Sequence, residues 1–373
     1  MRRTKLISIR VRLLSLFAVL AAASITFGQS GWTRAKLVDS ALADYQKKFK
    51  VPAISVAVLK KGQIVYIKGI GLARANPPLL ADGNTVYRLA SMSKSLTGVL
   101  AMDLVHKNKL NLGKGIREYV PSLPPFHQYT VDQGLSHLGG VRHYLDGDDP
   151  LKWQTKQYLT QKAALPLFQM SPIVAVPGET FNYSTPAFTV IGAAIEKVTN
   201  LPFMTYASMR FNQWGSPGIR PEMGDNPKRA AIFNFENGKN AGAERDNLSW
   251  KYPGGGFEAS VRDLALFAAK LMNGQILPVA RLNQMWTSRK TNAGELVGYG
   301  LGWNVGVSNG KKFADHSGEQ NGAKSYWRLF PDDKIAVVVL SNRRDHDPVH
   351  LGKWLGSVAV SEDSKTIAPY VVP

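Results

Sequence analysis

Two serines stand three residues before a lysine, a spacing that can activate a hydroxyl for attack on a carbonyl carbon. They are Ser91, before Lys94, and Ser308, before Lys311. On a helix, residues three apart share one face, so the amine one turn on could take the hydroxyl proton. A serine is a weak nucleophile until a base removes that proton. Because the pattern occurs twice, the surrounding sequence must decide between the two serines.

The surroundings favour Ser91. Apolar residues recur at helical spacing from Ser91 to Val105, and a helix N-terminus favours negative charge developing nearby. Ser308 lies in Ser-Asn-Gly, which is turn chemistry. Residues 306–310 also match G-x-S-x-G, the nucleophile elbow, which requires a strand, a sharp turn and then a helix. A strand is predicted at 312–316 instead, so we predict a hairpin there. The alternative for Ser91 is a helix cap followed by a surface lysine.

The elements expected around Ser91 are strands from both ends of the chain, with helices between them. The predicted helices are 35–49, 91–105, 187–198, 261–272 and 350–358, and the predicted strands are 53–59, 64–68, 302–307, 312–316, 325–330 and 335–340. The simplest closure is an α+β fold, in which one antiparallel sheet from both chain ends is covered by helices. The sheet lobe would comprise about 30–106 and 251–373, and 107–250 would form a mostly helical lobe. A cleft between two lobes is a common place for a site.

The N-terminus resembles a secretory signal peptide, which we place at residues 1–29. Residues 1–12 hold five basic residues and no acid, and an apolar run follows over 13–27. A basic region, a short apolar stretch and small residues are typical of such signals. The alternative is a membrane anchor, but the run is shorter than the ~20 residues of a span. We therefore expect an exported protein, periplasmic or secreted, with no membrane span after the signal is removed.

Composition excludes several kinds of chemistry. The chain of 373 residues has no cysteine, so disulfides, thiolate nucleophiles, cysteine-ligated zinc and iron–sulfur clusters are ruled out. The formal net charge is +19, and the chain stays basic without the five basic residues of the leader. Lysines and arginines are scattered without interleaved aromatic residues, which favours a solvated surface over a nucleic-acid site. Anionic envelope polymers are the more plausible macromolecular partners.

Four segments, in order, resemble the motifs of serine β-lactamase-related proteins. This family includes class C β-lactamases, D-Ala-D-Ala carboxypeptidases, family VIII esterases and D-aminopeptidases. The segments are 87–98 around Ser91, Phe-Asn-Tyr-Ser-Thr at 181–185, the glycine-rich turn at 250–257 and Asp-His-Ser-Gly at 315–318. The segment 136–144 is closest to the mitochondrial serine β-lactamase-like members and their bacterial relatives. The resemblance spans about residues 35–345 and implies a β-lactamase/transpeptidase-like fold.

By this resemblance Ser91 is the acylated nucleophile, and Lys94 and Tyr183 share the proton transfers. The backbone N–H groups of Ser91 and Glu319 would form the oxyanion hole, where losing one donor typically costs roughly 10²–10³ in rate. A lysine with its ordinary pKa of ~10.4 is protonated at neutral pH. Burial and nearby positive charge would lower that pKa.

The resemblance also places His316 among the catalytic residues and Thr185, Ser317 and Gly318 against the substrate. Thr185 stands where the family pattern often has asparagine, and it cannot offer an amide donor. His316 replaces the lysine of K-T-G, and a histidine is only partly charged near neutrality. Its grip on a substrate carboxylate would be weaker and pH-dependent. Both departures disfavour efficient β-lactam hydrolysis and suit an esterase, a D-amino-acid peptidase or another acyl hydrolase.

The sequence therefore predicts a serine hydrolase without a cofactor. It would form a covalent acyl-enzyme with peptide, amide, β-lactam or ester substrates, including cell-wall peptides. No metal site is expected, because His137 and His143 have no carboxylate cluster or H-E-x-x-H nearby, and a structural role suits them better. Glycines 254–256 lack the Gly-Lys-Ser/Thr of a phosphate loop and predict a sharp turn. The alternatives are a penicillin- or peptidoglycan-binding protein that stays acylated and a filament-forming protein.

Overall fold

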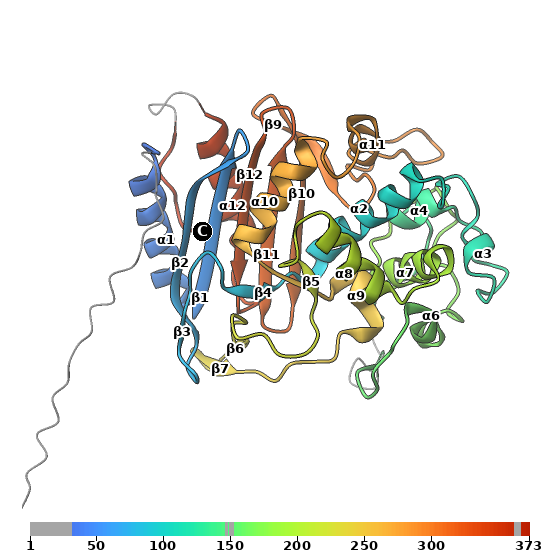
Figure 1. Cartoon of the computed structure of the whole chain (residues 1–373), viewed down its shortest axis with the longest axis horizontal. Coiled ribbons are helices and arrows are strands. Elements are labelled where there is room, and N and C mark those ends of the chain that lie inside the picture. The colour runs from blue at the N-terminus through green and yellow to red at the C-terminus, as the bar shows by residue number, and fades with distance from the viewer. Residues whose placement is uncertain (1–31, 146–147, 149–152, 362–366) are drawn as a thin grey trace, which may run out of the picture.

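Figure 1 shows a computed structural model of the chain, which describes residues 32–145, 148, 153–361 and 367–373. The predicted signal peptide at 1–29 lies outside the described residues. Within the described part of the chain, no helix is both long enough and apolar enough to cross a bilayer.

A seven-stranded antiparallel sheet joins the two ends of the chain, as the sequence predicts. Its order is β3-β2-β1-β12-β11-β10-β9. The bounds are β1 Ala53–Lys60, β2 Gln63–Arg74, β3 Leu79–Leu80, β9 Asn304–Ser308, β10 Lys311–Gln320, β11 Ala323–Phe330 and β12 Ile335–Ser341. Strands β1 and β12 pair at the centre, where Val56 lies opposite Val339.

Helices cover both faces of this sheet (Figure 1). They are α1 (Ala35–Phe49) and α12 (Pro348–Val360) on one face and α10 (Val261–Met272) on the other. Alternate residues of a strand point to opposite faces, so β1 feeds two cores. Val56 and Val58 pack in the core that includes Leu351 of α12. Ala57 belongs to the larger core, which includes Leu264 of α10.

The second lobe is mainly helical and lies beside one edge of the sheet (Figure 1). The remaining helices are α2 Ser93–His106, α3 Ile116–Tyr119, α4 Val131–Leu135, α6 Gln161–Ala164, α7 Thr185–Thr199, α8 Phe203–Gln213, α9 Tyr252–Gly255 and α11 Val279–Met285. Turns of 3₁₀ helix occur at η1 Ala90–Met92, η2 Leu165–Leu167 and η3 Ser249–Lys251. All of α2 except His106 is buried, so this helix is the core element between the lobes.

Short strands complete the molecule. They are β4 Val86–Arg88, β5 Arg220–Pro221 and β8 Phe257–Ser260 in one small sheet, and the hairpin β6 Phe233–Glu236 with β7 Lys239–Gly242. Strands β5, β6 and β7 and helix α8 fall in the segment 107–250, where the sequence indicated a single clear helix at 187–198. Glycines 254–256, predicted as a sharp turn, include the end of the short helix α9.

Strand β2 corrects one expectation. The sequence predicted a strand ending at residue 68, but the strand continues through Gly69 and Gly71 to Arg74. These glycines permit close chain crossings. A Cβ on Gly71 would lie 2.1 Å from the Pro52 carbonyl oxygen, and one on Gly69 would lie 2.4 Å from the Asp82 nitrogen. The glycines therefore mark tight backbone packing in this strand.

Two glycines of α12 give a matched test of packing on the sheet. A Cβ on Gly352 would lie 2.1 Å from Tyr326 Cδ1, whereas one on Gly356 would lie 3.2 Å from Phe330 Cε2. Overpacking typically costs about 1–3 kcal/mol, while glycine-to-alanine in a helix gains up to ~1 kcal/mol. We expect Gly352→Ala to lower the free energy of unfolding and Gly356→Ala to be near neutral, measured by urea denaturation. Equal effects would contradict this account.

Candidate active site

Ser91 lies in a 3₁₀ turn, η1, that directly precedes α2. The sequence predicted one helix starting at Ser91, and the structure divides it. Ala90 has φ +48°, a left-handed conformation that costs a non-glycine residue roughly 1–2 kcal/mol. The backbone of Leu89 holds this turn in place, because its N–H donates to Phe257 O at 2.9 Å and its carbonyl accepts from Ser325 Oγ at 2.7 Å. Hydrogen bonds between Leu89 and strands β8 and β11 thus hold the turn that contains the strained Ala90.

The amine of Lys94 is buried against three oxygens. Nζ lies 3.1 Å from Ser91 Oγ, 3.0 Å from Thr185 Oγ1 and 2.8 Å from Gly254 O. Among the residues that the structure describes, no carboxylate pairs with this amine. Burial, assisted by the charge of Lys251, holds the pKa of Lys94 well below its usual value. A neutral amine donates two hydrogens and keeps one lone pair, and since a carbonyl only accepts, the lone pair is available for the Ser91 O–H.

Tyr183 is the second group that interacts with the Ser91 side chain. Burial has the larger effect on the pKa of this phenol and raises it above its ordinary value, whereas hydrogen bonding to Ser91 lowers it. Lys94 Nζ lies 4.7 Å from the Tyr183 ring centroid. The amine and the phenol therefore flank one alcohol oxygen. Their pKa directions differ: the amine is the available base, and the protonated phenol is the available acid.

Two histidines position the segment that carries Tyr183. His137 Nδ1 accepts the Ser184 N–H at 3.1 Å, and His143 Nδ1 accepts the Thr185 N–H at 3.3 Å. Burial lowers the pKa of both rings, to about 4 for His143, so both are neutral acceptors. Backbone N–H groups at a helix start lack intrahelical partners, and these rings satisfy two of them at α7. This agrees with the structural role predicted for both histidines, and the described residues contain no metal-ligand cluster.

His316 is neutral, and both of its ring nitrogens are hydrogen-bonded. Its Nδ1 lies 2.6 Å from Ser317 O, which can only accept, so Nδ1 carries the proton; Nε2, at 3.0 Å, then accepts from the Tyr299 hydroxyl. Burial lowers the pKa of His316 to about 3. The expectation of a partly charged ring near neutrality is therefore wrong, because the low-polarity surroundings disfavour the imidazolium. A ring in this state cannot replace a lysine as a cationic grip on carboxylate.

Gly318 brings β10 against the nucleophile turn. A Cβ there would lie 2.3 Å from Leu89 O, 2.4 Å from Ser325 Oγ and 3.0 Å from Ala90 Cβ. Only a residue without a side chain permits this approach. The next residue, Glu319, lines the same cavity as Ser91. The first N–H groups of a helical turn lack internal partners, so the Ser91 N–H is available for the predicted oxyanion hole.

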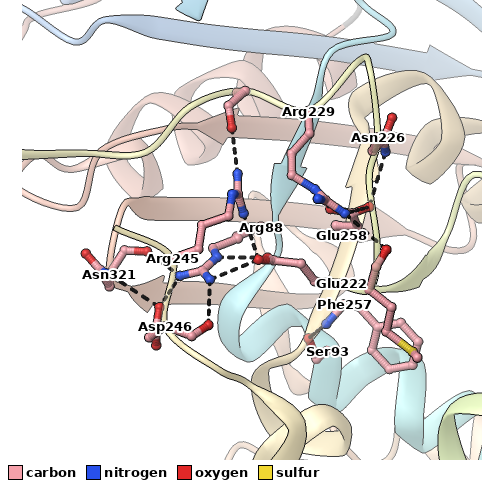
Figure 2. Close-up of polar contacts among 12 residues, drawn as sticks. Arg88, Ser93, Glu222, Asn226, Arg229, Arg245, Asp246, Phe257, Glu258 and Asn321 are labelled. Carbon is pink, nitrogen blue, oxygen red and sulfur yellow. Dashed lines mark hydrogen bonds and ion pairs between the residues drawn. The ribbon is translucent and has the colours of Figure 1, made fainter. Parts of the chain in front are cut away.

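A buried network of charged side chains, shown in Figure 2, supports the strand that precedes the nucleophile turn. The Arg88 side chain is fully buried in β4, three residues before the nucleophile. It donates to both carboxylate oxygens of Glu222 at 2.8 and 2.9 Å, to Asp246, and to Asn321 O at 3.1 Å. Arg245 also pairs with Glu222, at 2.7 Å. The network joins β4 to the chain after β10 and to the 222–246 segment. Removing one partner of a buried ion pair typically costs about 3–5 kcal/mol.

A cavity of about 200 Å³ opens at Ser91. Its lining comes from both lobes and consists of Ser91, His143, Tyr144, Thr185, Asp246, Lys251, Gly254, Gly255, Glu319, Gln320 and Asn321. Within the described residues a larger cavity of about 370 Å³ lies in the helical lobe, lined by residues such as Lys162 and Glu196. We assign the chemistry to the smaller cavity, because it holds the activated serine.

Four of the residues predicted from the sequence meet at the serine, and the others, His316, Ser317, Gly318 and Glu319, follow one another in β10. Ser91, Lys94, Tyr183 and Thr185 meet as predicted, and Thr185 contacts Lys94 as well as the cavity. Ser317 follows His316 in β10, and its carbonyl fixes the His316 tautomer.

Ser308, the other candidate nucleophile, does not line the cavity at Ser91. Ser308 ends β9, and the turn to β10 contains Asn309 at φ +52° and Gly310 at φ +70°. Lys311 pairs with Asp333 at 2.6 Å. The predicted hairpin is confirmed, and the lysine three residues after this serine is engaged by a carboxylate.

Sequence reasoning missed several residues that shape the site. Tyr299 and the Arg88 network were not singled out, because their partners lie 17 to 233 residues away in the chain. One signal was available for Arg88, since a charged residue amid Tyr-Arg-Leu-Ala, next to a nucleophile, requires a buried partner. Nothing comparable marks Tyr299 in the sequence.

A family model described as Beta-lactamase matches residues 38–358 of the chain. The mitochondrial serine beta-lactamase-like protein of Homo sapiens is 24% identical, over 76% of this chain and 69% of that protein. The staphylococcal relatives that the chain matches are about 21% identical over 82% of it, and the match spans 62% of their length. The resemblance inferred from the motifs is confirmed.

Two solved structures share the fold. The octameric penicillin-binding protein homologue from Pyrococcus abyssi superposes with a TM-score of 0.77 at 24% identity, covering 89% of this chain and 79% of that one. The D-stereospecific amidohydrolase from Streptomyces sp. gives a TM-score of 0.69 at 21% identity, covering 83% and 94%. The β-lactamase/transpeptidase-like α+β fold predicted from the sequence is confirmed.

Gly318 offers a direct test of the oxyanion geometry. In Gly318→Ala, the added methyl must push β10 away from Leu89 and Ala90, which moves the Glu319 N–H from the serine. We expect kcat to fall by roughly 10²–10³, the usual cost of a lost donor, together with a loss of about 1–3 kcal/mol in the free energy of unfolding from overpacking. Full activity in a folded variant would contradict this assignment. Gly242→Ala, at the end of β7, where an added Cβ meets no heavy atom within 4 Å, controls for glycine substitution away from the cavity.

The buried neutral histidines predict acid lability. His316 and His346 both have pKa values lowered to about 3 by burial, against ~6.5 in an unfolded chain. Between these values the unfolded state binds more protons, so the free energy of unfolding falls as pH falls, by up to about 1.4 kcal/mol per pH unit per histidine. We expect urea denaturation between about pH 6.5 and 4 to show this slope and His316→Gln to reduce it. An unchanged slope in that variant would exclude His316 as a source.

Proposed function

The chain belongs to the Beta-lactamase family, and from this and the geometry of the site we propose that it is a serine acyl hydrolase working through a covalent acyl-enzyme at Ser91. Members of the family are serine hydrolases that act on amides and esters. The observation that carries the proposal is the single oxygen of Ser91 held between the Lys94 amine, at 3.1 Å, and the Tyr183 hydroxyl.

In acylation, Lys94 takes the Ser91 proton as Oγ attacks the substrate carbonyl carbon. The carbonyl oxygen becomes an oxyanion, which the backbone N–H groups of Ser91 and Glu319 stabilise. Tyr183 donates its phenol proton to the leaving nitrogen or oxygen as that bond breaks. The Lys94 ammonium then returns a proton to Tyr183, which restores the neutral amine.

In deacylation, water replaces the leaving group. Lys94, again a neutral amine, accepts the water proton as the water oxygen attacks the acyl carbon, and its ammonium then supplies the proton that Ser91 Oγ regains. The second tetrahedral intermediate collapses, Ser91 Oγ departs and regains its proton, and the acid product leaves. The low pKa of Lys94 supports the base role, because a general base must be unprotonated at the working pH.

Peptide and amide bonds are the leading substrate class, with β-lactams and small esters as side substrates. The neutral, engaged His316 and the Thr185 hydroxyl beside Lys94 support this choice, since neither offers a cation or an amide to a β-lactam. The structural neighbour described as a D-stereospecific amidohydrolase is in agreement. We also propose that the protein is exported, on the basis of the basic and apolar leader at 1–29; the substrate would then be of cell-wall origin.

The test compares Ser91→Ala with Ser308→Ala on nitrocefin, p-nitrophenyl esters and D-Ala peptides. We expect Ser91→Ala to lose at least roughly 10⁴-fold in kcat/KM on every substrate that the wild type hydrolyses, as removal of an acylated serine does. Ser308→Ala should keep full activity. Mass spectrometry after a fluorophosphonate should place the adduct on Ser91. Hydrolysis that survives in Ser91→Ala would refute the proposal, and a penicillin adduct that never clears would indicate a binder.

A further inference from the structure

The cavity at Ser91 lies on the acyl side of the proposed reaction. Tyr183, which would protonate the leaving group, and His316 do not belong to the described lining, whereas Thr185, Gly255 and Gln320 do. A substrate carbonyl at Ser91 therefore directs its leaving group toward Tyr183 and its acyl chain into the cavity. The cavity lining then determines which acyl chains are accepted.

Lys251 is the lysine of this lining; the Asp246 carboxylate interacts with its charge but makes no ion pair with it. It ends the turn η3, its Nζ lies 5.3 Å from the Trp250 ring centroid, and no ion pair joins it to a described residue. Two carboxylates share the wall but have other partners. Asp246 pairs with Arg88 and lies 3.3 Å from Asn321 Nδ2, as Figure 2 shows.

Glu319, the other acid of the wall, pairs with Lys324. Lys251 thus lines a cavity that also contains the nucleophile, and its ammonium makes no ion pair with a described residue.

Gln320 supplies a second donor. Its Nε2 is shielded from solvent and has no hydrogen-bond partner among the described residues. Buried polar groups normally have a partner, so an exception calls for an explanation such as a missing ligand. The Gln320 amide and Lys251 lie near one point: a Cβ built on Gly255 would lie 3.5 Å from Gln320 Oε1 and 3.8 Å from Lys251 Cε, and turning the amide about its last side-chain bond presents Nε2 there instead of Oε1. The glycine leaves open the space between them.

We propose that Lys251 and Gln320 bind a carboxylate on the acyl portion of the substrate. The inference rests on the proposed function and names its substrate class: acyl donors whose chain ends in an acid, such as the monoesters or monoamides of dicarboxylic acids. The carboxylate would accept from the Lys251 ammonium and the Gln320 amide together. Charge-assisted hydrogen bonds of this kind are about twice as strong as neutral ones.

The experiment compares two esters of equal chain length, mono-p-nitrophenyl adipate, which carries a carboxylate, and p-nitrophenyl hexanoate, which does not. The readout is the ratio of kcat/KM for adipate to that for hexanoate. Lys251 also lowers the pKa of Lys94, but a change in the base affects both esters equally and leaves the ratio unchanged. The ratio therefore isolates recognition of the carboxylate.

The variants are Lys251→Met, Lys251→Arg, Gln320→Leu and the matched control Lys36→Met, an exposed lysine of α1. We expect Lys251→Met to lower the ratio by roughly tenfold or more, the size of one charged hydrogen bond. Lys251→Arg should keep most of the ratio, Gln320→Leu should lower it less than Lys251→Met does, and Lys36→Met should leave it unchanged. Fluorophosphonate labelling of Ser91 shows that each variant is folded around an active serine.

The outcomes separate the inference from the proposed function. If hexanoate hydrolysis depends on Ser91 but the ratio is the same in wild type and Lys251→Met, the carboxylate site is refuted and the serine hydrolase stands. Equal losses on both esters, with the ratio kept, also refute the carboxylate site and assign Lys251 to tuning the base. If neither ester is hydrolysed, or hydrolysis persists in Ser91→Ala, the proposed function fails and this inference fails with it.

Discussion

The site depends on one amine that is buried without a counterion among the described residues. Lys94 is surrounded by two hydroxyls and a carbonyl, and desolvation of an ammonium in such a place is expensive. The chain therefore favours the neutral amine, which is the form that can accept a proton from Ser91. The same burial keeps Tyr183 protonated and His137, His143 and His316 neutral. One cause, exclusion of water, thus sets the protonation state of the whole group.

Rigid support makes that exclusion possible. Lys94 is held where α2 begins, between the sheet and the helical lobe, and α2 is almost entirely buried. Arg88 fastens the preceding strand to Glu222 and Asp246, which lie in a segment with little regular structure of its own. A network of this kind contributes position more than stability, because desolvation offsets much of the attraction between the charges. The reaction partners are thereby fixed in place before a substrate arrives.

The sequence carried the local part of this structure well. Helix Ala35–Phe49 and helix Val261–Met272 were predicted with the observed bounds, since apolar spacing defines both and the Ser260 cap marks the start of the second. The spacing of Ser91 and Lys94, with the Tyr183 motif, identified the reacting group. The sequence could not show that His316 is neutral, because its partner Tyr299 and its burial arise from tertiary packing. The predicted strand was shorter than β2 because glycines such as Gly69 and Gly71 are typical of loops. In this strand they instead permit two backbone segments to cross closely.

The pairing of β1 with β12 has a consequence for biosynthesis. Ile54 of β1 lies opposite Ser341 of β12. Strand β1 therefore cannot form this pairing until β12 has been synthesised. Until residues 335–341 have been synthesised, the edge of β1 that pairs with β12 has no neighbour, and such edges invite association with other chains. A contact this distant in sequence also slows folding. The seven-stranded sheet can therefore be completed only after β12 has been synthesised.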